Sequence, residues 1–308
     1  MRARTMYAVT LLAALGCAAF AQMALPPLEA GAADRLAKSP RHGEWVTINA
    51  DGGDKVDAYV VYPERRDKAP VVLVVQEIFG LSDWIRSVAD QLAAEGFIAI
   101  APDFISGKGP DGKGSRSMTV EQARTINSAL KMPEVVARLH AAAKYGTSLP
   151  AAAKEFGVVG FCWGGGVSFL YATEQPNLSA AVVYYGVSPD AAALSKVKAP
   201  VLGLYGGDDA RVNATIPAAD AEMKRLGKRY EQEIYAGAGH GFLRQQDGRE
   251  GANMKATQQA WPRTVQFFKQ NLVPRMSMEV EPVPFVAANA AAATDVDCGD
   301  ACFLPLAK

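Results

Sequence analysis

Runs of apolar, strand-like residues alternate with helix-like segments over most of this chain. The run at 71–75 is continuous and rich in valine, which is typical of a strand covered on both faces. Residues 83–95 have helical spacing after Ser82, a suitable N-cap, and a second apolar strand follows at 97–101. Such alternation restricts the chain to an α/β fold with a mostly parallel central sheet and helices on both faces.

The alternation continues to about residue 271 and predicts one domain at 45–274. The chain has 308 residues, of which 49% are hydrophobic, and this is enough to bury a large core. Residues 106–118 are rich in Gly, Lys and Ser, which indicates an exposed loop. We predict further strands at 45–49 and 56–62, as an antiparallel start, and at 156–160, 180–185, 201–205 and 230–235, with further helices before 145 and at 163–173, 214–226 and 258–270.

The first 21 residues have the layout of a secretory signal peptide. Two arginines precede a nearly all-apolar stretch, and Ala-Phe-Ala at 19–21 fits a small-x-small cleavage site. The alternatives are an uncleaved anchor, for which the stretch is short, and lipidation at Cys17, for which the preceding residues match imperfectly. We therefore expect an exported protein, periplasmic or secreted, with a lead-in at 22–44 and no stable membrane span.

The composition changes after residue 274. The segment 275–308 contains proline-rich and alanine-rich stretches, and we interpret it as a C-terminal extension of the domain. Cys298 and Cys302 lie four residues apart within it, close enough for a local disulfide in an oxidising compartment. Cys162 is then an unpaired thiol, which in an exported protein requires an explanation.

Positive and negative side chains balance, with 32 of each. Without a basic surplus, nucleic acid is not favoured as a partner, and we expect a small molecule instead. The two cysteines of the extension have no nearby histidine, which makes them a poor zinc site. We expect no metal and no organic cofactor.

The strongest chemical signal is the sequence Gly160-Phe161-Cys162-Trp163-Gly164, which lies between a predicted strand and a predicted helix. It has the pattern of a nucleophile elbow, G-x-nucleophile-x-G, with cysteine as the nucleophile. Glycines are needed because larger side chains would collide with the neighbouring strand and helix. The turn should place the sulfur at the helix N-terminus, which favours the thiolate, and make the Trp163 amide an oxyanion donor. The alternative is a buried structural cysteine beside a packing turn.

An elbow nucleophile needs an acid and a histidine later in the chain. Of the three histidines, His240 lies on a Gly-flanked loop after the strand at 230–235, where a catalytic base belongs. Asp208 and Asp209 both follow the strand at 201–205, and spacing alone does not decide between them. A solvated loop histidine and a turn-capping aspartate are the alternatives.

A further acid, Glu77, directly follows the strand at 71–75. The carboxyl ends of parallel strands meet at one edge of a sheet, so Glu77 should lie near Cys162. A carboxylate at that place can take or hold the thiol proton and so control when the thiolate forms. The alternative is a solvent-facing loop glutamate.

Taken together, these motifs resemble the dienelactone hydrolase family. The resemblance covers about residues 45–271. The matching segments, in family order, are Gln76-Glu77-Ile78-Phe79-Gly80, Pro102-Asp103, Gly160 to Gly165, Tyr184-Tyr185-Gly186, Gly206-Gly207-x-Asp209-x-x-Val212 and His240-Gly241-Phe242.

The resemblance implies the α/β-hydrolase fold and a division of roles among these residues. Cys162 would be the nucleophile, Asp209 rather than Asp208 the acid, and His240 the base. Glu77 would control the thiol proton. The oxyanion hole would be formed by two backbone amides, those of Ile78 and Trp163.

Family members are similar in using arginines to bind a substrate carboxylate. Arg244, four residues after His240, matches one of these arginines. The second should lie in the loop after Pro102-Asp103, which is altered here, so that Arg116 or Arg124 is the candidate. The export signal and the C-terminal extension depart from the family's cytoplasmic catabolic members and leave the natural substrate open.

The expected function is hydrolysis of an ester or lactone, of the carboxymethylenebutenolidase type, with dienelactone to maleylacetate as the family reaction. The alternative from another class is a non-hydrolytic thiol protein, a redox sensor or disulfide exchanger that uses Cys162. Such proteins usually carry a resolving cysteine nearby, and only Cys298 and Cys302 are available for this. A binding protein that has lost its activity is a third alternative, against which the intact Cys, Asp and His set argues.

Overall fold

The structure, a computed structural model, describes residues 23–272 of the chain. The predicted signal peptide at 1–21, with Cys17, lies outside the described residues, as does the extension at 275–308 with Cys298 and Cys302. Export, lipidation and the local disulfide therefore stay predictions.

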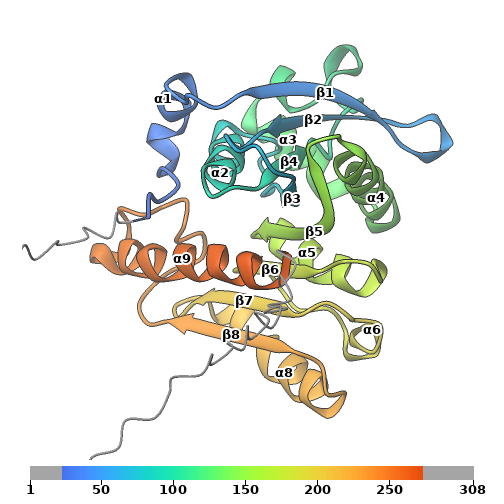
Figure 1. Cartoon of the computed structure of the whole chain (residues 1–308). Helices are drawn as coiled ribbons and strands as arrows, with labels where there is room; N and C mark the ends of the chain where they lie inside the picture. The colour runs from blue at the N-terminus through green and yellow to red at the C-terminus, as the bar shows by residue number, and fades with distance from the viewer. Residues whose placement is uncertain (1–22, 273–308) are drawn as a thin grey trace, which may run out of the picture. The chain divides into compact units, whose positions relative to one another are not determined.

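An eight-stranded sheet forms the centre of the described part, in the order β1-β2-β4-β3-β5-β6-β7-β8 (Figure 1). Strand β2 pairs antiparallel with both β1 and β4, and every other neighbouring pair is parallel. The mostly parallel sheet with an antiparallel start is thus confirmed. The strands are Gly43–Asn49 (β1), Lys55–Val61 (β2), Ala69–Val75 (β3), Ile98–Pro102 (β4), Ala152–Phe161 (β5), Ala180–Tyr184 (β6), Val201–Gly206 (β7) and Tyr230–Tyr235 (β8).

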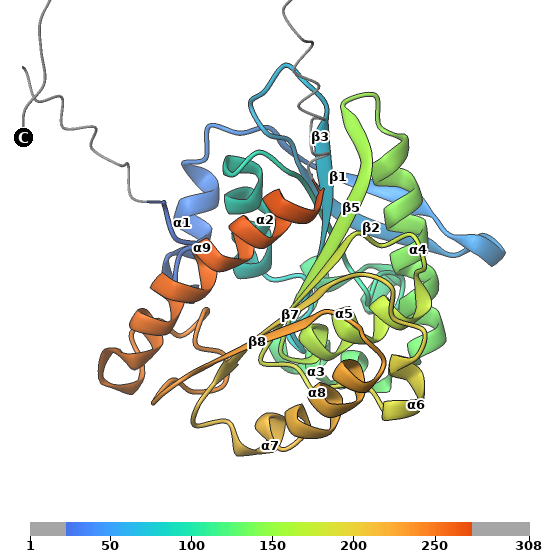
Figure 2. The ribbon, with the colours of Figure 1, turned by 60° about the horizontal axis from the view of Figure 1, so that its bottom comes forward.

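Helices cover both faces of this sheet, as predicted. Figure 2 shows α1, α2 and α9 on one side and α4, α5 and α8 on the other, and each group has its own buried apolar core against the sheet. The helices are Ala32–Ala37 (α1), Asp83–Ala94 (α2), Val120–Ala129 (α3), Met132–Ser148 (α4), Trp163–Glu174 (α5), Ala191–Leu194 (α6), Ala210–Asn213 (α7), Ile216–Arg225 (α8) and Ala252–Leu272 (α9), with 3-10 turns at Glu29–Gly31 (η1), Asp51–Gly53 (η2), Pro110–Gly112 (η3), Ser115–Ser117 (η4) and Arg249–Gly251 (η5).

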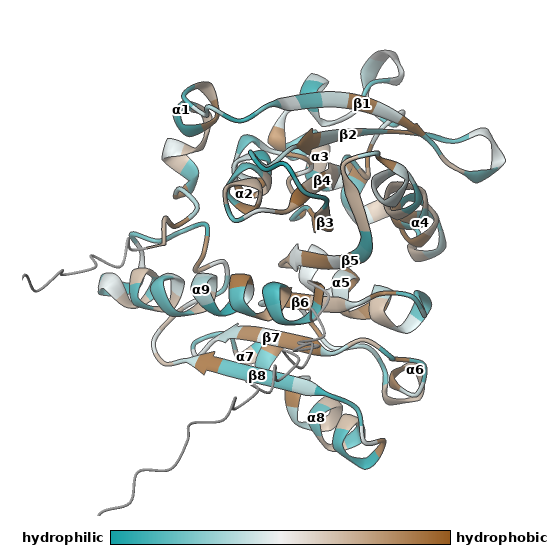
Figure 3. Ribbon diagram, in the orientation of Figure 1, coloured by the Kyte–Doolittle hydropathy of each residue, from teal (hydrophilic) through white to brown (hydrophobic). Residues whose placement is uncertain are grey.

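The interior strands could be predicted from the sequence because they are covered on both faces. All seven residues of β3 are buried, so the strand is a continuous apolar run instead of an alternating one. Figure 3 shows hydrophobic residues along β3, β6 and β7 and hydrophilic ones on β8. At the sheet edge β8 buries only Tyr235, which explains its polar composition.

Helix α9 begins at Ala252, six residues before the predicted start at 258. The first turn was missed because its buried residue Asn253 is polar. Asn253 accepts a hydrogen bond from the Gly239 amide at 2.9 Å and donates one to the Gln245 carbonyl at 2.6 Å. The start of α9 therefore fixes both ends of the loop that carries His240.

Candidate active site

Three of the predicted residues meet at the carboxyl edge of the sheet. Cys162 follows β5, Asp209 follows β7 and His240 follows β8, and the carboxyl ends of parallel strands form one edge. The Nδ1 atom of His240 lies 2.6 Å from Asp209 Oδ2, and its Nε2 atom lies 3.0 Å from Cys162 Sγ. The structure thus joins acid, imidazole and thiol in one hydrogen-bonded chain.

The turn that carries Cys162 is strained in the way the elbow pattern predicts. Cys162 has φ 56° and ψ −116°, a backbone conformation that residues other than glycine rarely adopt. A Cβ atom on Gly160 would lie 1.8 Å from the Gly164 carbonyl oxygen, and one on Gly164 would lie 2.3 Å from the Gln76 carbonyl oxygen. Both glycines are therefore required by close backbone approach, and the sulfur lies at the start of α5.

The structure separates the two neighbouring aspartates. Asp209 is buried, and its Oδ1 atom accepts the Val212 amide at 3.4 Å while Oδ2 faces His240. Asp208 is half exposed, and its carboxylate lies 3.2 Å from the guanidinium of Arg249. Only Asp209 can orient the imidazole.

The pKa of the Cys162 thiol is raised to about 11, mainly by burial and next by the charge of Glu77. The Trp163 amide has the opposite effect and lowers this pKa. The resting sulfur at neutral pH is therefore a thiol, and the thiolate expected at the helix N-terminus is not its ground state. The reason is that desolvation of a charged sulfur outweighs the helix dipole here. With Nδ1–H donated to Asp209, Nε2 of His240 is the acceptor for the thiol proton.

Glu77 lies in an ionic cluster beside the nucleophile. Its side chain is buried, and its Oε2 atom lies 2.7 Å from Arg244 Nε. Neither atom has a hydrogen-bond partner in the described range, so the contact between them is an ion pair. Burial raises the pKa of the Glu77 carboxyl to about 7, although Arg244 lowers it. Glu77 can therefore change its protonation state near neutral pH.

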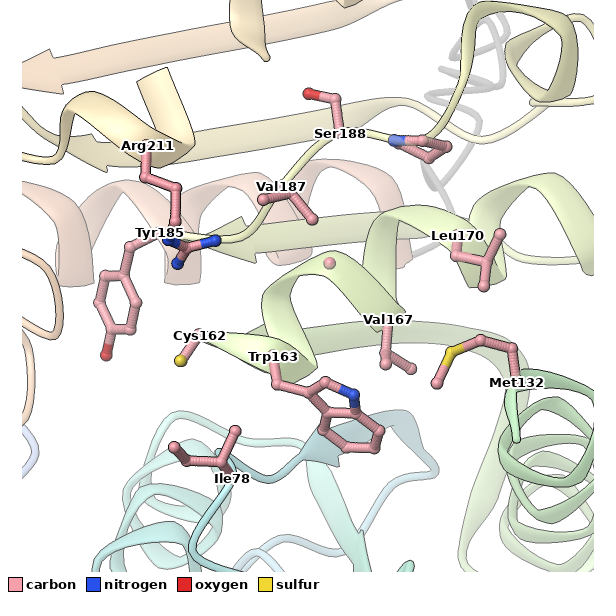
Figure 4. Close-up of a pocket in the computed structure, with 12 residues that line it drawn as sticks. Ile78, Met132, Cys162, Trp163, Val167, Leu170, Tyr185, Val187, Ser188 and Arg211 are labelled. Atoms are coloured by element: carbon pink, nitrogen blue, oxygen red, sulfur yellow. The ribbon is translucent and has the colours of Figure 1, made fainter. Parts of the chain in front are cut away.

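A pocket of about 480 Å³ opens beside Cys162 (Figure 4). Figure 4 shows Arg211, from α7, with its guanidinium directed toward Cys162, and no ion pair within residues 23–272 involves this arginine. The pocket can therefore accept a largely apolar molecule with an anionic group. Most of its wall is apolar, with Ile78, Met132, Trp163, Val167, Leu170, Tyr185, Val187 and Pro189 in the lining.

The three arginines predicted to bind substrate lie elsewhere. Arg244 is bound to carboxylates and is not part of the pocket wall. Arg116 lies 4.0 Å over the Trp45 ring, and Arg124 pairs with Glu121 on the surface of α3. The structure does not bring Arg116 or Arg124 to the pocket, because both side chains find local partners on the protein surface.

Arg211 was missed by the sequence reasoning, although a signal was present. It stands two residues after Asp209, at the carboxyl end of β7. Side chains that follow the ends of parallel strands reach the same edge as the nucleophile. The same rule that pointed to Glu77 could have found Arg211.

The two residues whose amides are expected to form the oxyanion hole both line the pocket beside Cys162. Ile78 lines the pocket, and its amide donates no hydrogen bond to another residue of the described range. The Trp163 amide lies next to the Cys162 sulfur and lowers the pKa of the thiol. Both N–H groups are thus available to stabilise negative charge beside Cys162.

None of the helices within 23–272 combines the length and apolarity that a bilayer crossing needs. In that range no three His, Cys, Asp or Glu side chains gather in a way that could hold a metal ion. Cys162 is a free thiol.

The layered sheet and the elbow at the end of β5 define an α/β-hydrolase, as predicted. A model of the dienelactone hydrolase family matches residues 56–272. The chain therefore belongs to the dienelactone hydrolase family, which confirms the resemblance seen in its motifs.

Known relatives agree with this membership. Two similar proteins carry the name "Putative carboxymethylenebutenolidase". The one from Salmonella typhimurium is 33% identical, and the match covers 73% of this chain and 86% of the relative. The one from Methylorubrum extorquens is 34% identical, and the match covers 70% of this chain and 77% of the relative. A solved "Putative Dienelactone Hydrolase" from Klebsiella pneumoniae subsp. pneumoniae matches with a TM-score of 0.66 and 29% identity, over 75% of this chain and 99% of that chain.

Proposed function

We propose that this protein hydrolyses an ester or lactone by covalent catalysis at Cys162. The observation that carries the proposal is the chain of hydrogen bonds from Asp209 through His240 to Cys162, which ends at the wall of an apolar pocket. The name carboxymethylenebutenolidase, borne by the relatives, supports a lactone such as dienelactone as the substrate class.

In the proposed mechanism His240 Nε2 takes the thiol proton as the sulfur attacks the substrate carbonyl carbon. The amides of Ile78 and Trp163 stabilise the oxyanion of the tetrahedral intermediate. The carbon–oxygen bond to the leaving group then breaks, and the imidazolium returns its proton to the leaving oxygen. Water, deprotonated by His240, attacks the thioester and releases the acid and the free thiol. Asp209 stabilises the imidazolium in both steps.

Turnover by this route has a direct test. We expect purified protein to hydrolyse a panel of aryl esters and five-membered lactones, and to lose this activity in step with alkylation of Cys162 by iodoacetamide. Peptide mass spectrometry measures the alkylated fraction. Hydrolysis that persists after complete labelling of Cys162 would contradict the covalent mechanism, whereas a protein that reacts only with disulfides would favour a redox function.

We further propose that the substrate carries an anionic group that faces Arg211. This arginine reaches the pocket from α7 and has no ionic partner in the described range, whereas Arg244 is already bound to two carboxylates. A guanidinium can bind a carboxylate through two parallel hydrogen bonds. Arg211 thus takes the role that the sequence had suggested for Arg244.

For Arg211→Gln we expect kcat/KM to fall about 10- to 100-fold for esters that carry a carboxylate, and to change little for neutral esters of the same size. The physical reason is the loss of one charge-assisted contact. Arg249→Gln is the matched control, because Arg249 pairs with Asp208 on the surface outside the pocket. Equal losses on charged and neutral esters would contradict this assignment, and a selective loss found only in Arg244→Gln would return the role to Arg244.

A further inference from the structure

The N-terminal segment at 23–31, which the mechanism above does not use, is docked onto the active-site loop. Its apolar residues Met23 and Leu25 pack against the core beneath α9 and α2. Glu29 also belongs to the segment. Three hydrogen bonds to main-chain atoms hold the segment, namely Gln246 Nε2 to the Pro26 carbonyl at 2.8 Å, Trp84 Nε1 to the Pro27 carbonyl at 3.0 Å, and the Glu29 amide to the Arg244 carbonyl at 3.1 Å.

The guanidinium of Arg244 contacts two carboxylates, those of Glu29 and Glu77. Its Nη1 atom donates a hydrogen bond to Glu29, whereas its Nε atom has only the ionic contact of 2.7 Å with Glu77. The Glu77 side chain is 3% exposed and the Glu29 side chain 55% exposed. The surface carboxylate thus has the better-directed interaction, although the buried carboxylate has the greater need of a partner.

We propose that Glu29 is a positioning residue of the active site, through which the N-terminal segment orients Arg244 and limits how well this arginine neutralises Glu77. The proposal rests on the proposed function, in that it takes Cys162 as the nucleophile and Glu77 as the carboxylate that influences its proton. It assigns the segment a part in the catalytic apparatus beyond its packing.

Several charged and titratable groups around Glu77 influence its pKa. Arg244 lowers the pKa of Glu77 and Glu29 raises it, while the Tyr185 hydroxyl faces Glu77 from the loop after β6 and also lowers it. Loss of the Glu29 charge removes a repulsion and frees Arg244 to turn toward Glu77. Both changes stabilise the Glu77 carboxylate, so Glu77 should titrate at lower pH.

A change in the protonation of Glu77 should alter the reactivity of the nucleophile, because the charge of Glu77 raises the pKa of Cys162. Cys162 also meets the charges of Arg211 and Arg244 and the imidazole of His240. Among the described residues, neither Arg211 nor His240 pairs with Glu29. A shift in the reactivity of the thiol therefore reports the changed pairing of Arg244 with Glu77.

The test is the pH profile of Cys162 alkylation by iodoacetamide in wild type and Glu29→Gln, measured by peptide mass spectrometry from pH 5 to 10. We expect an inflection near pH 7 in wild type, where Glu77 titrates, and a shift of this inflection to lower pH, by about half a unit or more, in the variant. Alkylation needs no substrate, so this result is independent of whether the protein hydrolyses esters.

Asp34→Asn is the matched control, since it removes one charge from the same N-terminal part but makes no contact with Arg244. Its profile should superimpose on that of wild type. A wild-type profile without an inflection between pH 6 and 8 would overturn the proposal. So would a Glu29→Gln profile that matches wild type or moves to higher pH, or an equal shift in Asp34→Asn.

Discussion

Replacement of Cys162 by alanine is expected to reduce kcat/KM for ester hydrolysis by roughly 10⁵-fold or more, the scale seen when the nucleophile of a triad is removed. The physical reason is that His240 then has no thiol to deprotonate, since Cys162 Sγ is the atom 3.0 Å from its Nε2. The fold should survive, because alanine is no more strained than cysteine at φ 56° and the glycines that shape the turn remain. Initial rates and thermal unfolding measure the two effects separately.

The control for this experiment is the double variant Cys298→Ser/Cys302→Ser, which keeps Cys162. We expect it to hydrolyse esters at the wild-type rate and to remain sensitive to iodoacetamide. Full activity of Cys162→Ala would exclude covalent catalysis at this residue. Loss of activity in the double variant instead would point to a thiol-exchange function that needs a resolving cysteine.

Much of the fold could be predicted from sequence because its interior strands carry a local signature. Strand β3 is buried along its whole length, and a strand covered on both faces needs no partner information to be recognised. Helix α1 and the first turn of α9 carried no such signature. Asn253 is buried there because it bonds to the loop around His240, and this tertiary interaction leaves no periodic pattern in the sequence.

The residues around Cys162 could be predicted to the extent that chain order and strand ends determine them. Cys162, Asp209 and His240 each follow a parallel strand, so the topology alone brings them to one edge. The partners of Arg244 depend on distant segments instead. Arg244 is bound by Glu29, which lies 215 residues earlier in the chain, and nothing in the sequence around Arg244 indicates that contact.

The protonation state of the Cys162 thiol also could not be predicted from the local sequence. A helix N-terminus favours a thiolate, and the elbow does place Cys162 at the start of α5. Burial of the sulfur and the charge of Glu77 nevertheless raise the pKa of the thiol to about 11. Desolvation depends on everything packed around the group, so its size could not be judged from the local sequence.

The choice between the two neighbouring aspartates leads to the second large effect. For Asp209→Asn we expect kcat to fall by about 10⁴-fold, because an amide cannot stabilise the imidazolium and favours the wrong tautomer of His240. Asp209 Oδ2 is the atom 2.6 Å from Nδ1 of that histidine. Steady-state rates on a neutral ester, together with the pH profile of kcat, provide the measurement.

Asp208→Asn is the matched control, since it removes the same charge from the adjacent position. Among the described residues the Asp208 side chain pairs with Arg249 at the surface. An exposed ion pair of this kind contributes little, so the variant should remain close to wild type. Equal losses in both variants would show that the loop tolerates no change at either position, and a larger loss in Asp208→Asn would mean that the wrong aspartate had been identified. Asparagine at 209 keeps a side-chain oxygen that can accept the Val212 amide, so a large difference between the two variants reports which carboxylate faces His240.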